Sequence, residues 1–274
     1  MKSVAQVWLL LMSILATTAV GSDDRIRDAL IASAALGRTL PVTIVAPAHP
    51  TPDSSVLFFL HGRGRNHRSL VDSPAARAAL LAAPFYVVLP QGEDGWYIDS
   101  PARPADRYGA YLGEVVAWAE RILPLGAGPA RRGIAGWSMG GYGAVRFAET
   151  HPGRFGFVAS AIGLLDFPCA EILPQGQNYH VPADRFTADP ATWRELNPLT
   201  DAGALRGSVI TLVLSRLGFE RTMNEHFAAE LARRHIPARV HWLDGGHEFA
   251  VVERAVPLVL TDAAAFFSAA EDAR

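Results

Sequence analysis

Residues 131 to 144 read Arg-Arg-Gly-Ile-Ala-Gly-Trp-Ser-Met-Gly-Gly-Tyr-Gly-Ala. Within them, Gly136-Trp137-Ser138-Met139-Gly140 matches G-x-S-x-G, the pattern of a tight turn between a strand and a helix that exposes a serine hydroxyl. Side chains two residues before and after the serine would collide with neighbouring backbone, which explains the two glycines. An apolar run precedes the motif and 139–150 has helical spacing, so the strand and the helix are both predicted. Ser138 is therefore a candidate nucleophile.

Length and composition set limits on the class of protein. The chain has 274 residues, of which 50% are hydrophobic, enough for one large α/β domain. The net charge is −2 and no basic stripe occurs, which argues against a nucleic-acid partner. Cys169 is the only cysteine, so neither an internal disulfide nor a cysteine metal cluster is expected. Composition does not predict the oligomeric state.

The first 21 residues differ in kind from the rest. Lys2 precedes an apolar stretch from Val4 to Val20, and small residues follow where a signal peptidase would cleave. We expect a cleaved signal peptide over 1–21, a mature domain over 22–274, and an exported protein, periplasmic or secreted, without stable membrane association. The alternative is a retained membrane anchor, for which the apolar stretch is short and interrupted by polar residues.

Strand-like and helix-like segments alternate along the remaining chain. This alternation predicts an α/β fold with a mostly parallel central sheet and helices on both faces. We expect the first two strands to be joined by a hairpin-like connection. Residues 162–205 contain several prolines and little periodicity, which indicates an irregular insertion over the site. The predicted strands are 39–45, 56–60, 85–89, a run ending at Ala135, 157–161, 209–214 and 240–243, and the predicted helices are 73–83, 106–123, 139–150, 225–234 and 251–267.

The loop after 56–60 is a candidate oxyanion hole. The strand is continuously apolar, as in a central strand covered on both faces, and ends in His61-Gly62-Arg63-Gly64. In enzymes with this serine elbow, one amide donor follows the nucleophile and the other comes from such a loop. The expected donors are the backbone N–H groups of Met139 and Arg63. His61 is interpreted as structural, with its ring hydrogen-bonded beneath the loop.

Two aromatic residues follow another predicted strand. Trp96 and Tyr97 lie in the loop 91–100, at the carboxyl end where open α/β sheets bind ligands. One interpretation places them in the substrate site. The other is aromatic packing beneath a long loop, and the sequence leaves both open.

A serine nucleophile needs a base and an acid that orients the base. In elbow enzymes the chain order is serine, acid, histidine, and His247 lies in a Gly-Gly turn after the last predicted strand. Glu220 is the favoured acid because it follows the strand that ends at Leu214. Glu225 remains an alternative, although an acid in the first turn of a helix stabilises the helix dipole without a catalytic role. Two further acids fit less well: Asp244 and Asp201.

Four motifs in this order give the chain a family resemblance over about residues 39–270. They are Leu60-His61-Gly62-x-Gly64, Trp96-Tyr97-x-Asp99-Ser100, Gly136-Trp137-Ser138-Met139-Gly140-Gly141 and Gly245-Gly246-His247. The chain resembles the α/β-hydrolase serine esterases of the S-formylglutathione hydrolase, feruloyl esterase and mycolyltransferase superfamily.

The resemblance implies a metal-free and cofactor-free carboxylesterase that forms an acyl-enzyme on Ser138, with His247 as base. The aromatic pair Trp96 and Tyr97, the proline-rich 162–205 segment and the expected export favour a short-chain or aromatic acyl ester of a small-molecule or carbohydrate alcohol as substrate. Two departures from the family stand out: Glu220 where aspartate is usual, and Trp137 where histidine is usual before the serine. An acyltransferase, or a non-catalytic relative that binds an acylated sugar or lipid, is the alternative function.

Overall fold

The computed structural model describes residues 22–171 and 173–272. The expected signal peptide therefore lies outside the described residues. The strands are β1 Ile26–Ser33, β2 Arg38–Val45, β3 Val56–Leu60, β4 Tyr86–Pro90, β5 Arg132–Trp137, β6 Phe157–Ala161, β7 Val209–Ser215 and β8 Ala238–Leu243. The α-helices are α1 Pro74–Ala82, α2 Tyr108–Ile122, α3 Met139–Thr150, α4 Ala183–Phe186, α5 Pro198–Asp201, α6 Arg221–Arg233 and α7 Phe249–Asp272. Short 3-10 helices are η1 Ser22–Arg25, η2 Pro129–Arg131, η3 Pro190–Glu195 and η4 Ala202–Leu205.

The strands form one eight-stranded sheet in the order β1-β2-β4-β3-β5-β6-β7-β8. All pairs from β4 to β8 are parallel, whereas β1 with β2 and β2 with β4 are antiparallel. The predicted α/β fold class is confirmed.

The hairpin-like connection predicted between the first two recognised strands is wrong. β4 lies between β2 and β3, so these consecutive strands do not pair. The hairpin in this region joins β1 to β2, and β1 was not recognised in the sequence. β1 is an edge strand with mixed burial, so it lacks the continuous apolar run that marked β3.

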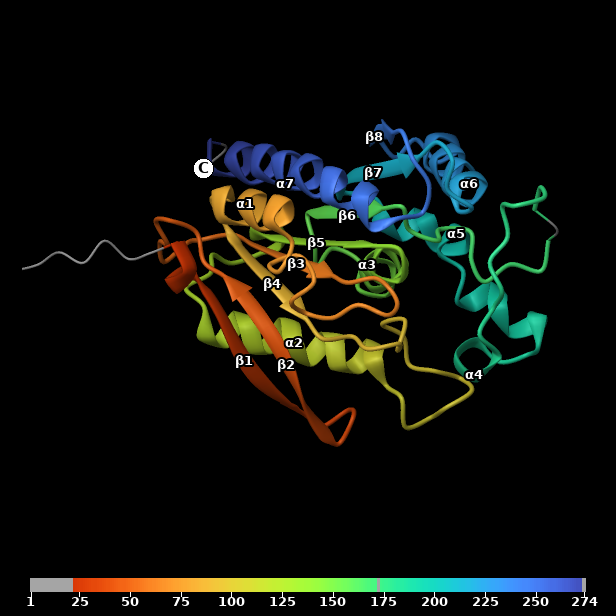
Figure 1. The fold of residues 1–274 in the computed structure, drawn as a ribbon, viewed down its shortest axis with the longest axis horizontal. Helices are drawn as coiled ribbons and strands as arrows, with labels where there is room; N and C mark the ends of the chain where they lie inside the picture. The colour runs from red at the N-terminus through yellow and green to blue at the C-terminus, as the bar shows by residue number, and fades with distance from the viewer. Residues whose placement is uncertain (1–21, 172, 273–274) are drawn as a thin grey trace, which may run out of the picture.

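Helices cover both faces of the sheet. Side chains alternate along β3: Leu57 and Phe59 pack with α1 and α7, whereas Phe58 and Leu60 pack on the side of α2 and α3. Figure 1 shows α1 and α7 on one face and α2 on the other. β3 is therefore buried on both sides, as its uninterrupted apolar sequence predicted.

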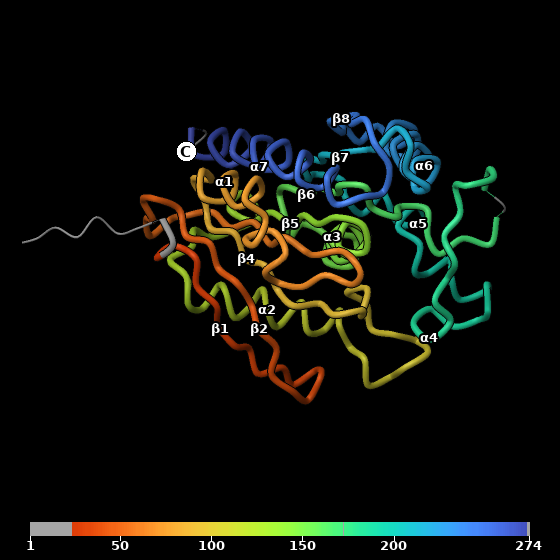
Figure 2. Tube along the Cα trace, in the orientation of Figure 1, coloured from red at the N-terminus to blue at the C-terminus, as the bar shows by residue number. Residues whose placement is uncertain are grey.

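The segment between β6 and β7 contains only short helical turns, α4, η3, α5 and η4. The trace in Figure 2 shows it as the green to teal loops that extend beyond one end of the sheet. Because β3, β5, β6 and β7 run parallel, the loops at their carboxyl ends gather at one edge. Within the described ranges, no helix combines the length and apolar character needed to cross a bilayer.

Candidate active site

Ser138 stands at the turn between β5 and α3 with a φ of 53° and a ψ of −122°. The positive φ is unusual for a non-glycine residue. A Cβ on Gly136 would lie 2.2 Å from the carbonyl oxygen of Gly140, and a Cβ on Gly140 would lie 2.2 Å from that of Leu60. These contacts are the steric reason for glycine at both positions. The serine is half-buried, so its hydroxyl reaches the surface of a cavity.

His247 and Glu220 lie beside the serine in a continuous chain of hydrogen bonds. The Oγ of Ser138 is 2.8 Å from Nε2 of His247, and Nδ1 of His247 is 2.8 Å from Oε2 of Glu220. Glu220 is fully buried at the N-cap of α6, and His247 lies in the loop between β8 and α7. The carboxylate accepts the Nδ1–H proton, which leaves Nε2 free to accept the serine proton. The arrangement suits a nucleophile, base and orienting acid.

The other candidate acids do not contact His247. Glu225 and Asp244 form ion pairs on exposed parts of the surface, and Asp201 is bound at the end of α3. Their respective partners are Arg221, Arg216 and Arg146.

The two expected oxyanion donors flank the serine. Met139 is the first residue of α3, where a backbone N–H has no intrahelical acceptor and lies at the positive end of the helix dipole. A Cβ on Gly62 would lie 3.2 Å from Cβ of Ser138, so the loop carrying Arg63 packs directly against Ser138. Among the described residues, neither amide donates a hydrogen bond within the protein. Both N–H groups are thus available to an oxygen bound beside Ser138.

A cavity of about 190 Å³ opens beside Ser138 and His247. Arg63 lines the cavity, and its guanidinium is held in place by hydrogen bonds to Asp94 at 2.8 Å and to the hydroxyl of Tyr179 at 3.0 Å. These hydrogen bonds raise the pKa of Arg63, first through Asp94. Apolar side chains form much of the remaining lining: Trp137, Ile162, Phe249 and Val252.

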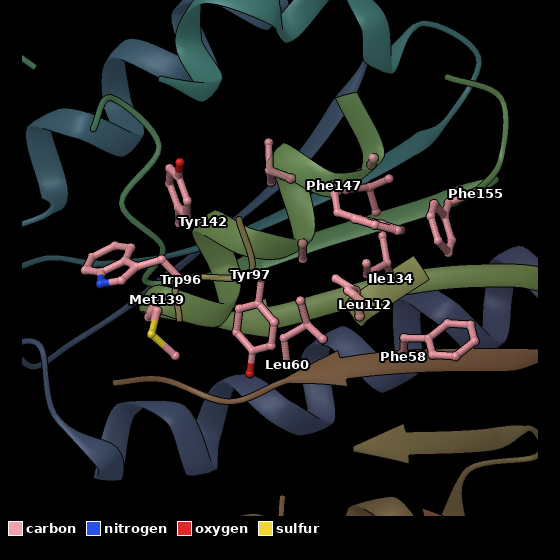
Figure 3. Packing of buried hydrophobic residues seen from close by; sticks show 14 of the residues in the cluster. Phe58, Leu60, Trp96, Tyr97, Leu112, Ile134, Met139, Tyr142, Phe147 and Phe155 are labelled. Carbon is pink, nitrogen blue, oxygen red and sulfur yellow. The ribbon is translucent and has the colours of Figure 1, made fainter. Parts of the chain in front are cut away.

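Trp96 and Tyr97 do not line this cavity. Each is only 1% exposed, and Figure 3 shows both within the hydrophobic cluster, with Trp96 beside Tyr142. The phenol oxygen of Tyr97 accepts the backbone N–H of His61 at 3.0 Å, which fixes the oxyanion loop from below. The interpretation of Trp96 and Tyr97 as substrate-binding residues is therefore corrected: both side chains pack beneath the loop, as in the second interpretation. Both residues have positive φ values, 55° and 57°, which are unusual for non-glycine residues.

The aromatic ring beside His247 is that of Phe219, which the sequence pattern did not indicate, and Tyr179 packs behind it. The ring of Phe219 lies 4.4 Å from that of His247, and Tyr179 stacks on Phe219 at 5.3 Å. Both are half-buried. Tyr179 belongs to the segment between β6 and β7, whose lack of periodicity gave no indication of which residues face the site.

His61 occupies a buried position beneath the loop. Its Nε2 accepts the N–H of Gly92 at 2.8 Å, and Nδ1 lies 2.8 Å from the carbonyl oxygen of Gly62. Burial lowers its pKa to about 4, so the ring is neutral and Nδ1 carries the proton. The ring joins the loops after β3 and β4, in line with the structural interpretation.

The mostly parallel sheet, the tight turn at Ser138 between β5 and α3, and the chain order Ser138, Glu220, His247 are those of the α/β-hydrolase fold, so this chain belongs to that class. Sequence comparison is more specific. Residues 33–254 match the family model described as "Putative esterase". The chain belongs to this esterase family. Within the described residues, no group of three or more His, Cys, Asp and Glu side chains is placed to hold a metal ion.

Curated relatives match over a shorter stretch. Esterase Rv1288 of Mycobacterium tuberculosis is 29% identical over 113 residues, which are 39% of this chain and 25% of that protein. The Acetyl esterase of Caldicellulosiruptor saccharolyticus is 27% identical over 111 residues, 40% of this chain and 41% of that protein. The match thus spans less than half the length of these relatives.

Solved structures share the fold over most of the chain. Staphylococcus aureus FphF, a fluorophosphonate-binding serine hydrolase, has a TM-score of 0.76 at 18% identity, over 87% of this chain and 98% of its own. A ferulic acid esterase gives 0.70 at 19% identity, over 88% and 97%. Mycobacterium tuberculosis MPT51 (FbpC1) gives 0.71 at 18% identity, over 88% and 98%. At these identities the likeness shows a common fold.

Proposed function

We propose that this protein is a serine carboxylesterase that works through an acyl-enzyme on Ser138. The hydrogen-bond chain from Ser138 through His247 to Glu220 is the observation that carries the proposal. Family membership supports an ester as substrate. The same site could transfer the acyl group to an acceptor alcohol other than water, but no described contact favours such an acceptor.

The proposed reaction begins with attack of Ser138 Oγ on the ester carbonyl carbon while His247 Nε2 takes the hydroxyl proton. The amides of Arg63 and Met139 would donate to the negative oxygen that develops. Protonated His247 then gives its proton to the departing alkoxide, which leaves as the alcohol. A water molecule attacks the acyl-enzyme by the same route and releases the acid and free Ser138.

The cavity supports a small acyl group. Its volume is about 190 Å³. The aromatic side chains that line the cavity, Trp137 and Phe249, would contact a planar acyl group or a sugar ring, the role first considered for Trp96 and Tyr97. We therefore propose short-chain or aromatic acyl esters of soluble, carbohydrate or other small alcohols, and hydrolysis outside the cytoplasm after export.

The test is a panel of p-nitrophenyl esters from acetate to palmitate, together with methyl ferulate and acetylated xylan. We expect the highest kcat/KM with short or aromatic acyl groups, whereas a maximum at palmitate would contradict the substrate proposal.

Ser138→Ala should lower kcat by about 10³-fold or more because the covalent step is lost. Fluorophosphonate should label wild type at Ser138 alone. A non-catalytic binding protein would release no p-nitrophenol above the uncatalysed rate.

A further inference from the structure

Glu220 occupies a buried position in which both carboxylate oxygens have separate partners. Oε2 lies 2.8 Å from Nδ1 of His247, and Oε1 accepts the hydroxyl proton of Ser215 at 2.6 Å. Ser215 is the last residue of β7, and, like Glu220, it is fully buried. The Ser215 hydroxyl does not line the cavity beside Ser138. Any effect of this residue on substrate must therefore pass through Glu220.

The space for the carboxylate comes from Gly218. A Cβ at this position would lie 2.1 Å from Oγ of Ser215 and 2.2 and 2.4 Å from the two carboxylate oxygens of Glu220. Real Cβ atoms do not approach other atoms so closely. The glutamate side chain thus occupies volume that any side chain at 218 would take. Gly218 leaves the space and Ser215 supplies the hydrogen bond for the carboxylate of Glu220, whose side chain is longer than that of aspartate; we call these two residues the seat of Glu220.

Hydrogen bonds hold the backbone of this seat on both sides. The N–H of Leu217 donates to Gly245 in the histidine loop at 3.0 Å, and Nε2 of Gln177 donates to the carbonyl oxygen of Gly218 at 3.2 Å. Asn224 Nδ2 donates to the backbone oxygen of Glu220 at 2.8 Å. The backbone is fixed, so the remaining freedom lies in the rotatable bonds of the glutamate side chain.

We propose that Ser215 is a positioning residue for the esterase reaction, whose hydroxyl holds the Glu220 carboxylate with Oε2 toward His247. The inference rests on the proposed roles of Ser138 and His247. Without the hydroxyl, Oε1 would be a buried oxygen with no donor, and rotation about the last side-chain bond would be less restricted. His247 would then be held less often in the orientation in which Nε2 faces Ser138.

Ser215→Ala and Ser160→Ala form a matched pair of variants. Ser160 is also a buried strand serine, in β6, but its hydroxyl has no hydrogen-bond partner among the described residues. In the full chain, kcat and KM for p-nitrophenyl acetate should be measured with the thermal midpoint and the low-field proton NMR signal of His247 Nδ1–H. Absence of this signal from a His247→Gln variant assigns it.

We expect Ser215→Ala to lower kcat by about 10- to 100-fold, the usual cost of losing a group that orients a site residue, with KM within about twofold of wild type. Its His247 signal should move upfield or broaden. Ser160→Ala should match wild type in both readouts. Wild-type kcat or an unchanged signal in Ser215→Ala would overturn the proposal, as would equal kcat losses in the two variants.

The NMR readout keeps this inference separate from the proposed function. If wild type hydrolyses no ester, the esterase proposal fails, but the His247 signal still reports whether Ser215 holds the acid. A His247 signal that changes in Ser215→Ala and not in Ser160→Ala would then support the proposal that the Ser215 hydroxyl holds the Glu220 carboxylate. A wild-type protein with no assignable His247 signal under conditions where the fold is intact would count against it.

Discussion

Ser138 combines backbone strain with an accessible hydroxyl. Its φ of 53° is disfavoured for a residue with a Cβ, and such strain persists only where surrounding contacts hold it. The N–H of Ser138 donates to Ala161 at 3.0 Å, and its carbonyl oxygen accepts the N–H of Tyr142 at 3.0 Å. These bonds anchor the turn to β6 and to α3. The hydroxyl is thereby held 2.8 Å from Nε2 of His247.

Glu220→Gln should lower kcat by about 10³- to 10⁴-fold, because a neutral amide neither stabilises the protonated imidazole nor fixes its tautomer. Glu225→Gln is the matched control, since this exposed acid pairs with Arg221 and not with His247 among the described residues. We expect its activity to stay within about twofold of wild type, as for most surface changes. Steady-state kinetics with p-nitrophenyl acetate measures both. The reverse pattern would remove Glu220 from the mechanism while leaving the esterase proposal in place.

At the scale of elements, the elbow depends on close approach of β3, β5 and α3. Leu60 of β3 pairs with Gly136 of β5, and the start of α3 passes over both. The strand ends and the helix start can meet only because no side chain separates them. The same approach brings the loop after β3 against Ser138.

Gly136→Ala should destabilise the fold by about 2 kcal/mol or more, since the added methyl overlaps backbone rather than a movable side chain. Gly113→Ala is a control in α2 with no atom within 4 Å of the new Cβ. It should be neutral or stabilise by about 0.5–1 kcal/mol, because alanine is the better helix former. Urea unfolding followed by circular dichroism compares the two. Equal urea midpoints for the two variants would show that the turn at Ser138 accommodates a Cβ at position 136.

The loops after β3 and β4 give a pH-dependent contribution to stability. The pKa of His61 falls to about 4 through burial, against 6.5 in the unfolded chain, with His67 lowering it further and Glu93 opposing. The unfolded state therefore binds more protons between these values. Stability is fully present above about pH 6.5 and is lost as the pH falls toward 4, by up to about 3 kcal/mol.

The measurement is the free energy of unfolding in urea at pH 7.5 and pH 5, in wild type and His61→Gln. Glutamine keeps an acceptor for the N–H of Gly92 but does not titrate. We expect the difference between the two pH values to be larger in wild type. An identical difference in both proteins would mean that His61 is protonated in the folded state.

At the scale of the whole molecule, the helices pack on the two faces of the sheet, whereas the candidate site lies at one edge of it. α1 and α7 cover one face and α2 and α3 the other, while Ser138, Glu220 and His247 lie in the connections at one edge. Much of the chain thus builds a rigid support for three side chains separated by 82 and 27 residues in sequence, from 138 to 220 and from 220 to 247. Rigid elements hold such side chains better than isolated loops could.

Export is a prediction about the molecule that the described residues leave untested. We expect protein recovered outside the cytoplasm to begin near Ser22, because the small residues before it suit signal peptidase. N-terminal sequencing or intact mass of the recovered protein measures this. An amino terminus that still includes Val4 to Val20, in a membrane fraction, would indicate a retained anchor instead.

The sequence by itself determined the features that depend on local pattern. The elbow glycines, the continuous apolar run of β3 and the cap of α1 at Ser73, whose hydroxyl accepts the N–H of Ala76, each follow from steric or hydrogen-bonding needs within a few residues. Strand and helix alternation then predicted a parallel sheet, and parallel strands bring their carboxyl ends to one edge. The chain order of serine, acid and histidine pointed to the three side chains that the structure brings together.

Only the tertiary structure decided features that depend on distant pairing. β4 inserts between β2 and β3, and β1 is held by an antiparallel partner, because hydrogen bonds between strands are not encoded by adjacency in the chain. The side chains of Trp96 and Tyr97 turn into the core because of their loop's backbone path, which an aromatic pair in sequence does not reveal. The surroundings of Glu220 likewise depend on the tertiary structure, in which Ser215 donates a hydrogen bond to its carboxylate and Gly218 leaves room for it.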